Sequence, residues 1–245
     1  MRSRSYTLAV ALAAGLIAHV LGCGGASAAP AVPTGVVVAR YAFDAGAGAD
    51  NSGRGHTLTV IAGHGGSVRT IAHGTGRALA FPAKCTAMAK RSCPHVVLQT
   101  RPAADLNPGT RPIAYGAAVR LARSQTTKGQ NILQKGYSAT TSQYKLQIDG
   151  AAGRPSCVLV DDRKPAIRLV RSSVSVADGA WHAVECRRAG AVFTIVVDRV
   201  VRGVLAIPAA LSVRNGGPLS VGGKGASANN DQFQGALDNV WVRIG

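Results

Sequence analysis

Residues 178–204 constrain the fold of this chain more than any other stretch. An Asp-Gly turn signal opens the segment, and the residues after it alternate between the two faces of a predicted strand. A run of mostly β-branched residues at 192–197 predicts a second strand, and an Arg-Arg-Ala-Gly turn at 187–190 joins the two. Because such a hairpin cannot bury its apolar side chains alone, the rest of the chain must supply a second sheet.

The remaining β-rich segments have the number and spacing of a single large sandwich. They recur about every 8 to 15 residues between turns rich in Gly, Pro and Asn. No twelve-residue segment after the N-terminal leader holds a helical period. The sequence therefore predicts an all-β fold of two packed antiparallel sheets. The expected strands are 36–41, 58–61, 76–81, 96–98, 113–121, 131–137, 144–149, 157–160, 167–170, 218–223 and 233–244.

The N-terminus has the organisation of an export signal. A basic start and an apolar stretch precede the small-residue cleavage motif Ala26-Ser27-Ala28. This pattern predicts a signal peptide at 1–28, a linker at 29–35 and one domain at 36–245. A lipobox reading of residues 20–23 is the alternative, and it would leave a lipid-anchored Cys23 at the cell surface. No later run is long and apolar enough to span a bilayer.

The chain is strongly basic. Its net charge is +17, and loss of Arg2 and Arg4 with the signal leaves +15. Such a charge attracts acidic polysaccharide, teichoic acid or nucleic acid at long range, in a salt-sensitive way and without sequence specificity. The arginines are spread along the chain, which favours a solvated basic surface over a dedicated basic groove.

Four cysteines remain after cleavage at the signal, and an even number in an exported chain indicates two disulfides. Three connectivities are possible. We expect the local pairs Cys85 with Cys93, across one loop, and Cys157 with Cys186, from one strand to the next. A zinc site is not indicated, because there is no CxxC motif and no paired histidine.

Several stretches together resemble the laminin G-like jelly-roll domains of the concanavalin A-like lectin/glucanase superfamily. The matching pieces are YAFDAGAGADNSGRG, GRALAF, ILQKG with YKLQID, DGAWHAVECRRAGAVFTIVVD, PLSVGG and GALDNVWV, in this order across residues 36–245. The resemblance implies a two-sheet jelly roll whose first and last strands lie side by side.

The same resemblance implies a structural calcium ion near those terminal strands. The matching positions are Asp44 in the first loop and Asp238 in the last strand, and a Gly-rich loop offers further carbonyl ligands. The alternative is that both are turn aspartates that accept hydrogen bonds from backbone amides. Only Asp50 adds another carboxylate to the same loop.

Glycoside hydrolases of this superfamily need two carboxyl groups at a fixed separation, one of them protonated. The chain has one glutamate, Glu185, with no acid two or four residues further on. A lyase would need a set such as Arg168, His182, Tyr144 and Gln147, which no motif holds together. We therefore expect no catalytic residues.

Polar loop residues are the expected ligand contacts, because Trp181 and Trp241 fall in strand motifs typical of framework positions. We expect the two loops to flank neighbouring strands, to share one rim of the sandwich and to bind an acidic or neutral glycan. Their candidate residues are Asn51, Arg54 and His56 in the first loop, and Lys224, Asn229, Asn230 and Asp231 in the last.

The sequence thus predicts an exported, non-catalytic recognition module for carbohydrate or another cell-surface polymer. A polyanionic polysaccharide lyase and a structural envelope protein are the alternatives.

Overall fold

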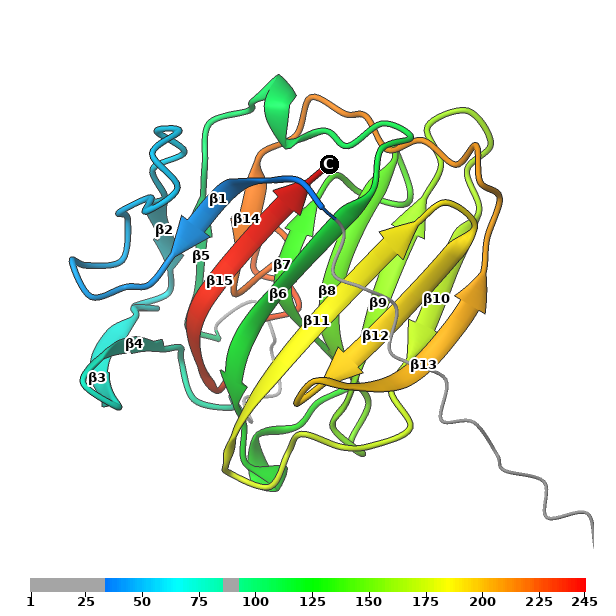
Figure 1. The fold of residues 1–245 in the computed structure, drawn as a ribbon. Coiled ribbons are helices and arrows are strands. Elements are labelled where there is room, and N and C mark those ends of the chain that lie inside the picture. Colours follow the sequence, from blue (N-terminus) through cyan, green and yellow to red (C-terminus); the bar gives the residue numbers. More distant parts are fainter. Residues whose placement is uncertain (1–33, 86–92) are drawn as a thin grey trace, which may run out of the picture.

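The computed structural model describes residues 34–85 and 93–245 as two antiparallel sheets packed face to face (Figure 1). Sheet A has the strand order β13-β12-β11-β6-β15-β4-β3, and β1 pairs with β15 beside β4. Its strands are β1 (Val36–Tyr41), β3 (Arg69–His73), β4 (Gly76–Ala80), β6 (Ile113–Arg120), β11 (Trp181–Ala189), β12 (Val192–Val197), β13 (Val200–Ala206) and β15 (Ala236–Ile244).

Sheet B has the order β10-β9-β8-β7-β14-β5-β2 and lies behind sheet A in the view of Figure 1. Its strands are β2 (Thr59–Gly63), β5 (His95–Gln99), β7 (Gly129–Lys135), β8 (Gln143–Asp149), β9 (Arg154–Val160), β10 (Ile167–Arg171) and β14 (Leu219–Val221). The helices of the described residues are two short 3₁₀ turns, η2 (Ala104–Leu106) and η3 (Arg123–Gln125).

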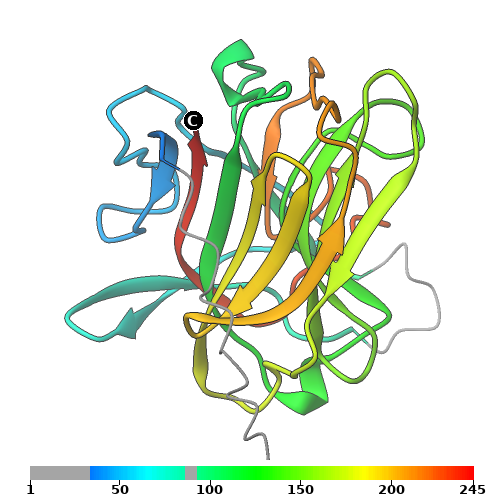
Figure 2. The ribbon, with the colours of Figure 1, turned by 45° about the vertical axis from the view of Figure 1, so that its right-hand side comes forward.

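The predicted two-sheet jelly roll is confirmed, including its first and last strands as neighbours. Val36 pairs with Ile244, and Tyr41 pairs with Val240. The expected strand segments all correspond to strands, but the sequence prediction lacked β3 and β13. Figure 2 shows the β3–β4 hairpin reaching well beyond the rest of sheet A. Strand β13 follows a two-residue turn in which Asp198 and Arg199 both have positive φ, at 51° and 68°.

The organising hairpin is present, although its turn is tighter than predicted. Arg187 and Arg188 are strand residues of β11, paired with Thr194 and Phe193 of β12. The turn is made by Gly190, whose φ of 54° suits a residue without a side chain, and the residue after it. The predicted alternation is present in β11, because Val184 and Cys186 are buried in the core while Ala183, just before them, is exposed.

Both predicted disulfides are present. Cys85 bonds Cys93 and Cys157 bonds Cys186, each with a Cα–Cα distance of 5.7 Å. The second bridge differs from the prediction in what it joins. Cys157 lies on β9 of sheet B and Cys186 on β11 of sheet A, so it connects the two sheets through the core and not two adjacent strands.

The predicted signal peptide at 1–28, the lipobox with Cys23 and most of the linker lie outside the described residues. In the described part of the chain, no helix has the length and apolar character needed to cross a membrane.

Candidate functional site

The outer face of sheet A has a strip of small side chains along β6. Residues paired across neighbouring strands share a face, so the pairing register shows what flanks this strip. Gly116 pairs with Glu185 on one side and Trp241 on the other, and Ala114 pairs with Arg187 and Arg243. Ala118 continues the strip, between Ala183 and Asp238. The small side chains of β6 thus form the floor of a trough between larger residues of β11 and β15, which we call the β6 trough.

Trp241 forms one wall of the β6 trough. A Cβ atom at Gly116 would lie 2.6 Å from the Val184 carbonyl oxygen and 3.3 Å from Cζ2 of this indole, so a side chain there would clash with β11 and crowd the ring. Next to the trough, over β1 and β15 and reaching Glu185 of β11, lies a hollow of about 390 Å³, which we call the upper hollow. It is lined by Val37, Arg40, Glu185, Asn239, Trp241 and Arg243.

A stack of side chains lies at the lower end of the trough. The ring of His73, from the β3–β4 hairpin, lies 3.9 Å from the ring of Trp181, with an interplanar angle of 20°. The guanidinium carbon of Arg120 lies 5.1 Å from the centroid of the same indole. Nδ1 of His73 is 2.6 Å from Oδ2 of Asp238, which ties the hairpin to β15. Both tryptophans are therefore half-buried on the outer face and are not framework residues of the core.

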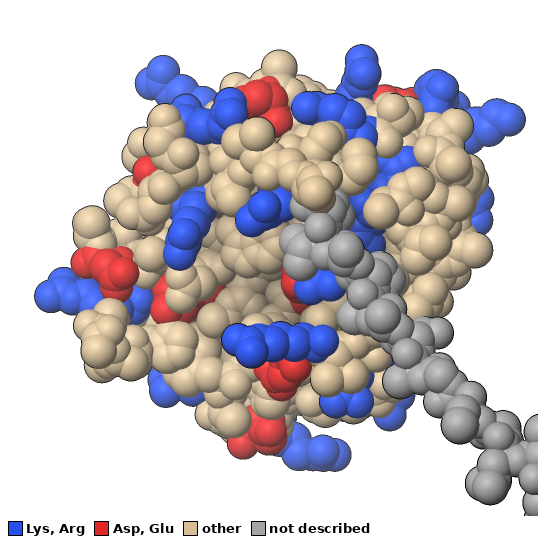
Figure 3. Space-filling view, in the orientation of Figure 1, with Lys and Arg blue, Asp and Glu red and all other residues tan. Residues whose placement is uncertain are grey.

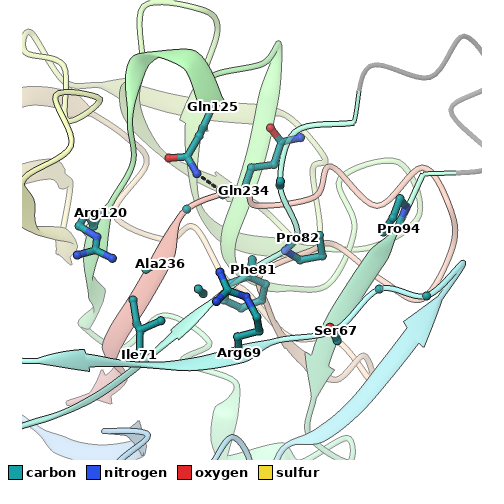
Figure 4. A pocket seen from close by; sticks show the side chains of 15 residues that line it. Ser67, Arg69, Ile71, Phe81, Pro82, Pro94, Arg120, Gln125, Gln234 and Ala236 are labelled. Atoms are coloured by element: carbon teal, nitrogen blue, oxygen red, sulfur yellow. Dashed lines mark hydrogen bonds between the residues drawn. The ribbon is translucent and has the colours of Figure 1, made fainter.

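A second hollow of about 440 Å³ lies below this stack, between the β3–β4 hairpin and the ends of β6 and β15 (Figure 4). Its floor follows one row of the sheet, in which Arg69 pairs with Ala80, Ala80 with Ala236, and Ala236 with Arg120. Two arginines are therefore separated by two alanines. The other side chains of its wall include Ile71, Phe81, Pro82, Pro94, Gln125 and Gln234.

Basic side chains surround this face, which is hollowed at its centre in Figure 3. Among the described residues, the charged nitrogens of Arg40, Arg69, Arg120 and Arg243 have no carboxylate oxygen within 4.0 Å. Glu185 is paired with Arg187, whose Nη2 lies 2.7 Å from Oε2. The outer face of sheet A therefore carries excess positive charge above an uncharged floor.

Two acids share this face, Glu185 on β11 and Asp238 on β15, with β6 between them. Strand spacing and register place their Cα atoms about 12 Å apart. Each carboxylate has a protein partner. Oε2 of Glu185 accepts a hydrogen bond from Arg187. Oδ1 of Asp238 accepts from the backbone N–H of Asn239 at 2.6 Å, and its Oδ2 pairs with His73. Hydrolysis needs a pair of carboxyl groups that are free to act on the substrate, and both of these carboxylates already have protein partners.

The structure does not bring the considered lyase set together. Tyr144 is buried in the core, where its hydroxyl donates to the Leu106 carbonyl. Gln147 is on sheet B and donates to Asp149 and Ser156, and Arg168 is exposed on the edge strand β10.

His182, the fourth member of that set, is held between two aspartates on sheet A. Its Nε2 is 3.0 Å from Asp178 and its Nδ1 is 2.7 Å from Asp198. Partial burial opposes protonation of the imidazole, but the hydrogen bonds to Asp198 and Asp178 outweigh it and raise the pKa of His182. The imidazole joins the ends of β11 and β12, which is a structural role.

The first predicted loop is tied to the end of β1 and to η2 by its polar side chains. Oδ1 of Asn51 accepts from the Ala42 N–H, and Nε2 of His56 is 2.9 Å from Asp105. Arg54 is exposed. The loop leads into β2 at Thr59, opposite Gln99 at the end of β5.

The last predicted loop is attached elsewhere. Lys224 pairs with Asp231 at 3.1 Å, Asn229 is exposed and Asn230 is buried. Gln232 of this loop accepts from the N–H of Val96, near the start of β5. The two loops are thus anchored at opposite ends of β5, so the expected common rim is not formed. Sugar contacts from either loop stay a prediction.

Asp44 and Asp238 are both near the β3–β4 hairpin, but they offer a poor donor set for calcium. Oδ1 of Asp44 accepts from the Arg77 N–H at 2.7 Å, and both oxygens of Asp238 are engaged as described above. Among the described residues, no group of three or more His, Cys, Asp or Glu side chains is arranged to hold a metal ion. Calcium binding stays a prediction, which melting curves with calcium and with a chelator would test.

Asp50, the other carboxylate in the loop that contains Asp44, organises this loop. Its oxygens accept hydrogen bonds from the backbone N–H groups of Arg40, Ser52 and His56. Partial burial opposes ionisation, but the hydrogen bonds from Ser52, His56 and Arg40 outweigh it and lower the pKa of Asp50. This carboxylate already has the partners that a metal ion would have to replace.

Comparison with known proteins places the chain in a fold family. The family model described as the concanavalin A-like lectin/glucanases superfamily matches residues 97–243, more than half of the chain. No curated protein matches the chain significantly in sequence.

Solved structures resemble the chain in fold at low sequence identity. Domain 4 of an extracellular arabinanase from Geobacillus stearothermophilus, solved with arabinotriose, has a TM-score of 0.65 at 13% identity, over 86% of this chain and 93% of that one. The binding domain of Paraclostridial Mosquitocidal Protein 1 has a TM-score of 0.63 at 13% identity, over 85% of this chain. The binding domain of Botulinum Neurotoxin DC with SialylT has a TM-score of 0.58 at 8% identity, over 84% of this chain. The chain spans about half the length of the two toxin domains, 48% and 47% respectively.

Proposed function

The chain belongs to the concanavalin A-like lectin/glucanase superfamily, and from this premise we propose that it is an exported, non-catalytic module that binds carbohydrate. The observation that carries the proposal is the β6 trough. A small-residue floor beside a half-buried tryptophan suits the flat apolar face of a sugar ring, and arginines at the rim suit its oxygens. The fold supports the same proposal, because its structural relatives include a domain solved with arabinotriose.

Export is proposed on two grounds. The N-terminal sequence has the pattern of a signal peptide, and the two disulfides are bonds that persist in oxidising compartments. Lipid anchoring through Cys23 is the alternative form of the same proposal.

The absence of catalysis is part of the proposal. It is supported by the single acid in the upper hollow, Glu185, and by its ion pair with Arg187. Incubation with acidic and neutral polysaccharides, followed by assays for new reducing ends and for unsaturated products, tests it. Release of either product would show that the protein cleaves its ligand.

The Trp241→Ala variant is expected to bind glycan at least tenfold more weakly than the wild-type protein. Removal of the indole takes away the apolar wall beside Gly116, while the floor and the basic rim remain. A glycan array identifies ligands of the wild-type protein, and isothermal titration with the best of them gives the affinity ratio.

Ile167→Ala is the matched control, because Ile167 is 63% exposed on β10 of the other sheet. Its affinity is expected to equal that of the wild type. Unchanged binding by Trp241→Ala, with melting curves showing that both variants are folded, would exclude the β6 trough as the site.

A further inference from the structure

The lower hollow has its own chemistry, apart from the β6 trough. Arg69 approaches it from β3 and Arg120 from β6, and Figure 4 shows both side chains beside the same hollow. Neither guanidinium has a carboxylate partner among the described residues, and Arg120 is held by the indole of Trp181. Two unneutralised guanidinium groups around one small hollow favour an anionic ligand, because each presents several N–H donors to carboxylate oxygens.

The rest of the wall combines apolar side chains with two glutamines, Gln125 and Gln234. Ile71, Phe81, Pro82 and Pro94 provide a surface for C–H groups. Gln125 holds η3 against the residues that precede β15, since its Nε2 donates to the Gln234 carbonyl at 2.6 Å and its Oε1 accepts from the Ala122 N–H at 2.7 Å. At about 440 Å³ the hollow lies within the range of small-molecule sites, and its walls are pre-formed.

Its position relates it to the β6 trough. Arg120 and Gly116 are four residues apart on β6, which corresponds to about 13 Å along the strand. The stack of His73 on Trp181 lies between the two hollows. A ligand that reaches both hollows is therefore a chain of several sugar units and not a single sugar.

We propose that the lower hollow is a subsite for a carboxylate-bearing sugar, so that the ligand of this protein is an acidic polysaccharide containing hexuronic acid. The carboxylate is held between Arg69 and Arg120, and the ring lies against the apolar wall. The inference deepens the proposed function and rests on it. Inorganic anions lack the apolar ring that the wall formed by Ile71, Phe81, Pro82 and Pro94 would contact.

Two matched probes test the subsite. They are an oligogalacturonate of defined size and its fully methyl-esterified form, which differ in charge but hardly in shape. Titration of the wild-type protein is expected to give at least tenfold tighter binding of the free acid. The Arg69→Gln variant is expected to lose most of this preference while its affinity for the ester changes less than twofold.

Arg77→Gln is the matched control, because Arg77 is an exposed arginine of the same hairpin on β4 that does not line the hollow. It removes the same charge and is expected to keep the preference for the acid. If Arg69→Gln and Arg77→Gln lose the same part of the preference for the free acid, the preference comes from long-range charge, and the subsite is overturned.

The remaining outcomes separate the two proposals. Equal binding of the acid and the ester by the wild-type protein would overturn the subsite and leave carbohydrate binding intact. A wild-type protein that binds neither probe, and no other glycan on an array, would overturn both. Loss of all binding in Trp241→Ala, with a preserved preference in Arg69→Gln, would support the β6 trough and overturn the lower hollow.

Discussion

Replacement of Arg188 by methionine is expected to lower the free energy of unfolding by about 3–5 kcal/mol. Arg188 is 1% exposed, and its five N–H groups all donate to backbone carbonyls. Burial also lowers the pKa of the Arg188 guanidinium, because the charged form loses its contact with water. The methionine side chain fills much of the same volume but leaves these carbonyl oxygens without their donors.

The position of those carbonyls explains the size of the effect. They belong to Thr110 and Arg111 before β6, to Gly190 in the hairpin turn, and to Ala209 and Leu211 after β13. One side chain therefore holds three loops together at one end of sheet A. Chemical denaturation followed by far-UV circular dichroism measures the loss, which corresponds to roughly 10 °C in melting temperature for a domain of this size.

Two further variants make the prediction specific. Arg188→Lys keeps the charge, but an ammonium group cannot reach carbonyls in five directions, so less than half of the lost stability should return. Arg168→Met removes an exposed arginine on β10 and should change stability by less than about 0.5 kcal/mol. If Arg188→Met is as stable as Arg168→Met, the five hydrogen bonds of Arg188 contribute nothing to stability.

The double variant Cys157→Ala/Cys186→Ala is expected to lose about 3–4 kcal/mol. In the wild-type protein this disulfide closes a loop across a sequence separation of 29. Without it the unfolded chain gains conformational entropy, and the loop length predicts a loss of stability of about this size. The bridge also joins β9 to β11, so its removal relaxes the contact between the two sheets. Thermal unfolding of the oxidised wild-type protein and the variant measures the difference.

The second disulfide supplies the control for this prediction. Cys85 and Cys93 are separated by 8 residues, so the double alanine variant at these positions should lose about 2.5 kcal/mol by the same account. The inter-sheet bridge is therefore expected to contribute more. A larger loss on removing the short-loop bridge would contradict the proposed importance of the connection between sheets.

The fold was predictable because strand patterns are local. The alternation in 178–204 and the β-branched run at 192–197 are readable at a period of two residues, and the side-by-side terminal strands followed from the resemblance. The missed strands lack that signal. Strand β13 interrupts its apolar run with Arg202 and Gly203, and β3 is a short, largely exposed strand that pairs on one edge only with β4.

The candidate site was harder to predict, because its residues are distant in the sequence. Each tryptophan lies in an ordinary strand motif, and nothing in the local pattern says that the ring of Trp241 lies beside Gly116 or that Trp181 stacks on His73. The small residues Ala114, Gly116 and Ala118 were the available signal, since alternate small residues on one strand face leave a depression wherever the flanking strands carry large side chains.

The fold class, the presence of two disulfides and the basic charge were predictable from the sequence, because strand alternation, an even number of cysteines and composition are properties of the chain whatever its neighbours are. Only the tertiary structure decided where that charge acts. It buried Arg188 among carbonyls, paired Arg187 with Glu185, and left Arg69 and Arg120 without a carboxylate around one hollow. The physical reason is that the environment of a side chain depends on strand register, and register is set by packing contacts between segments far apart in the chain.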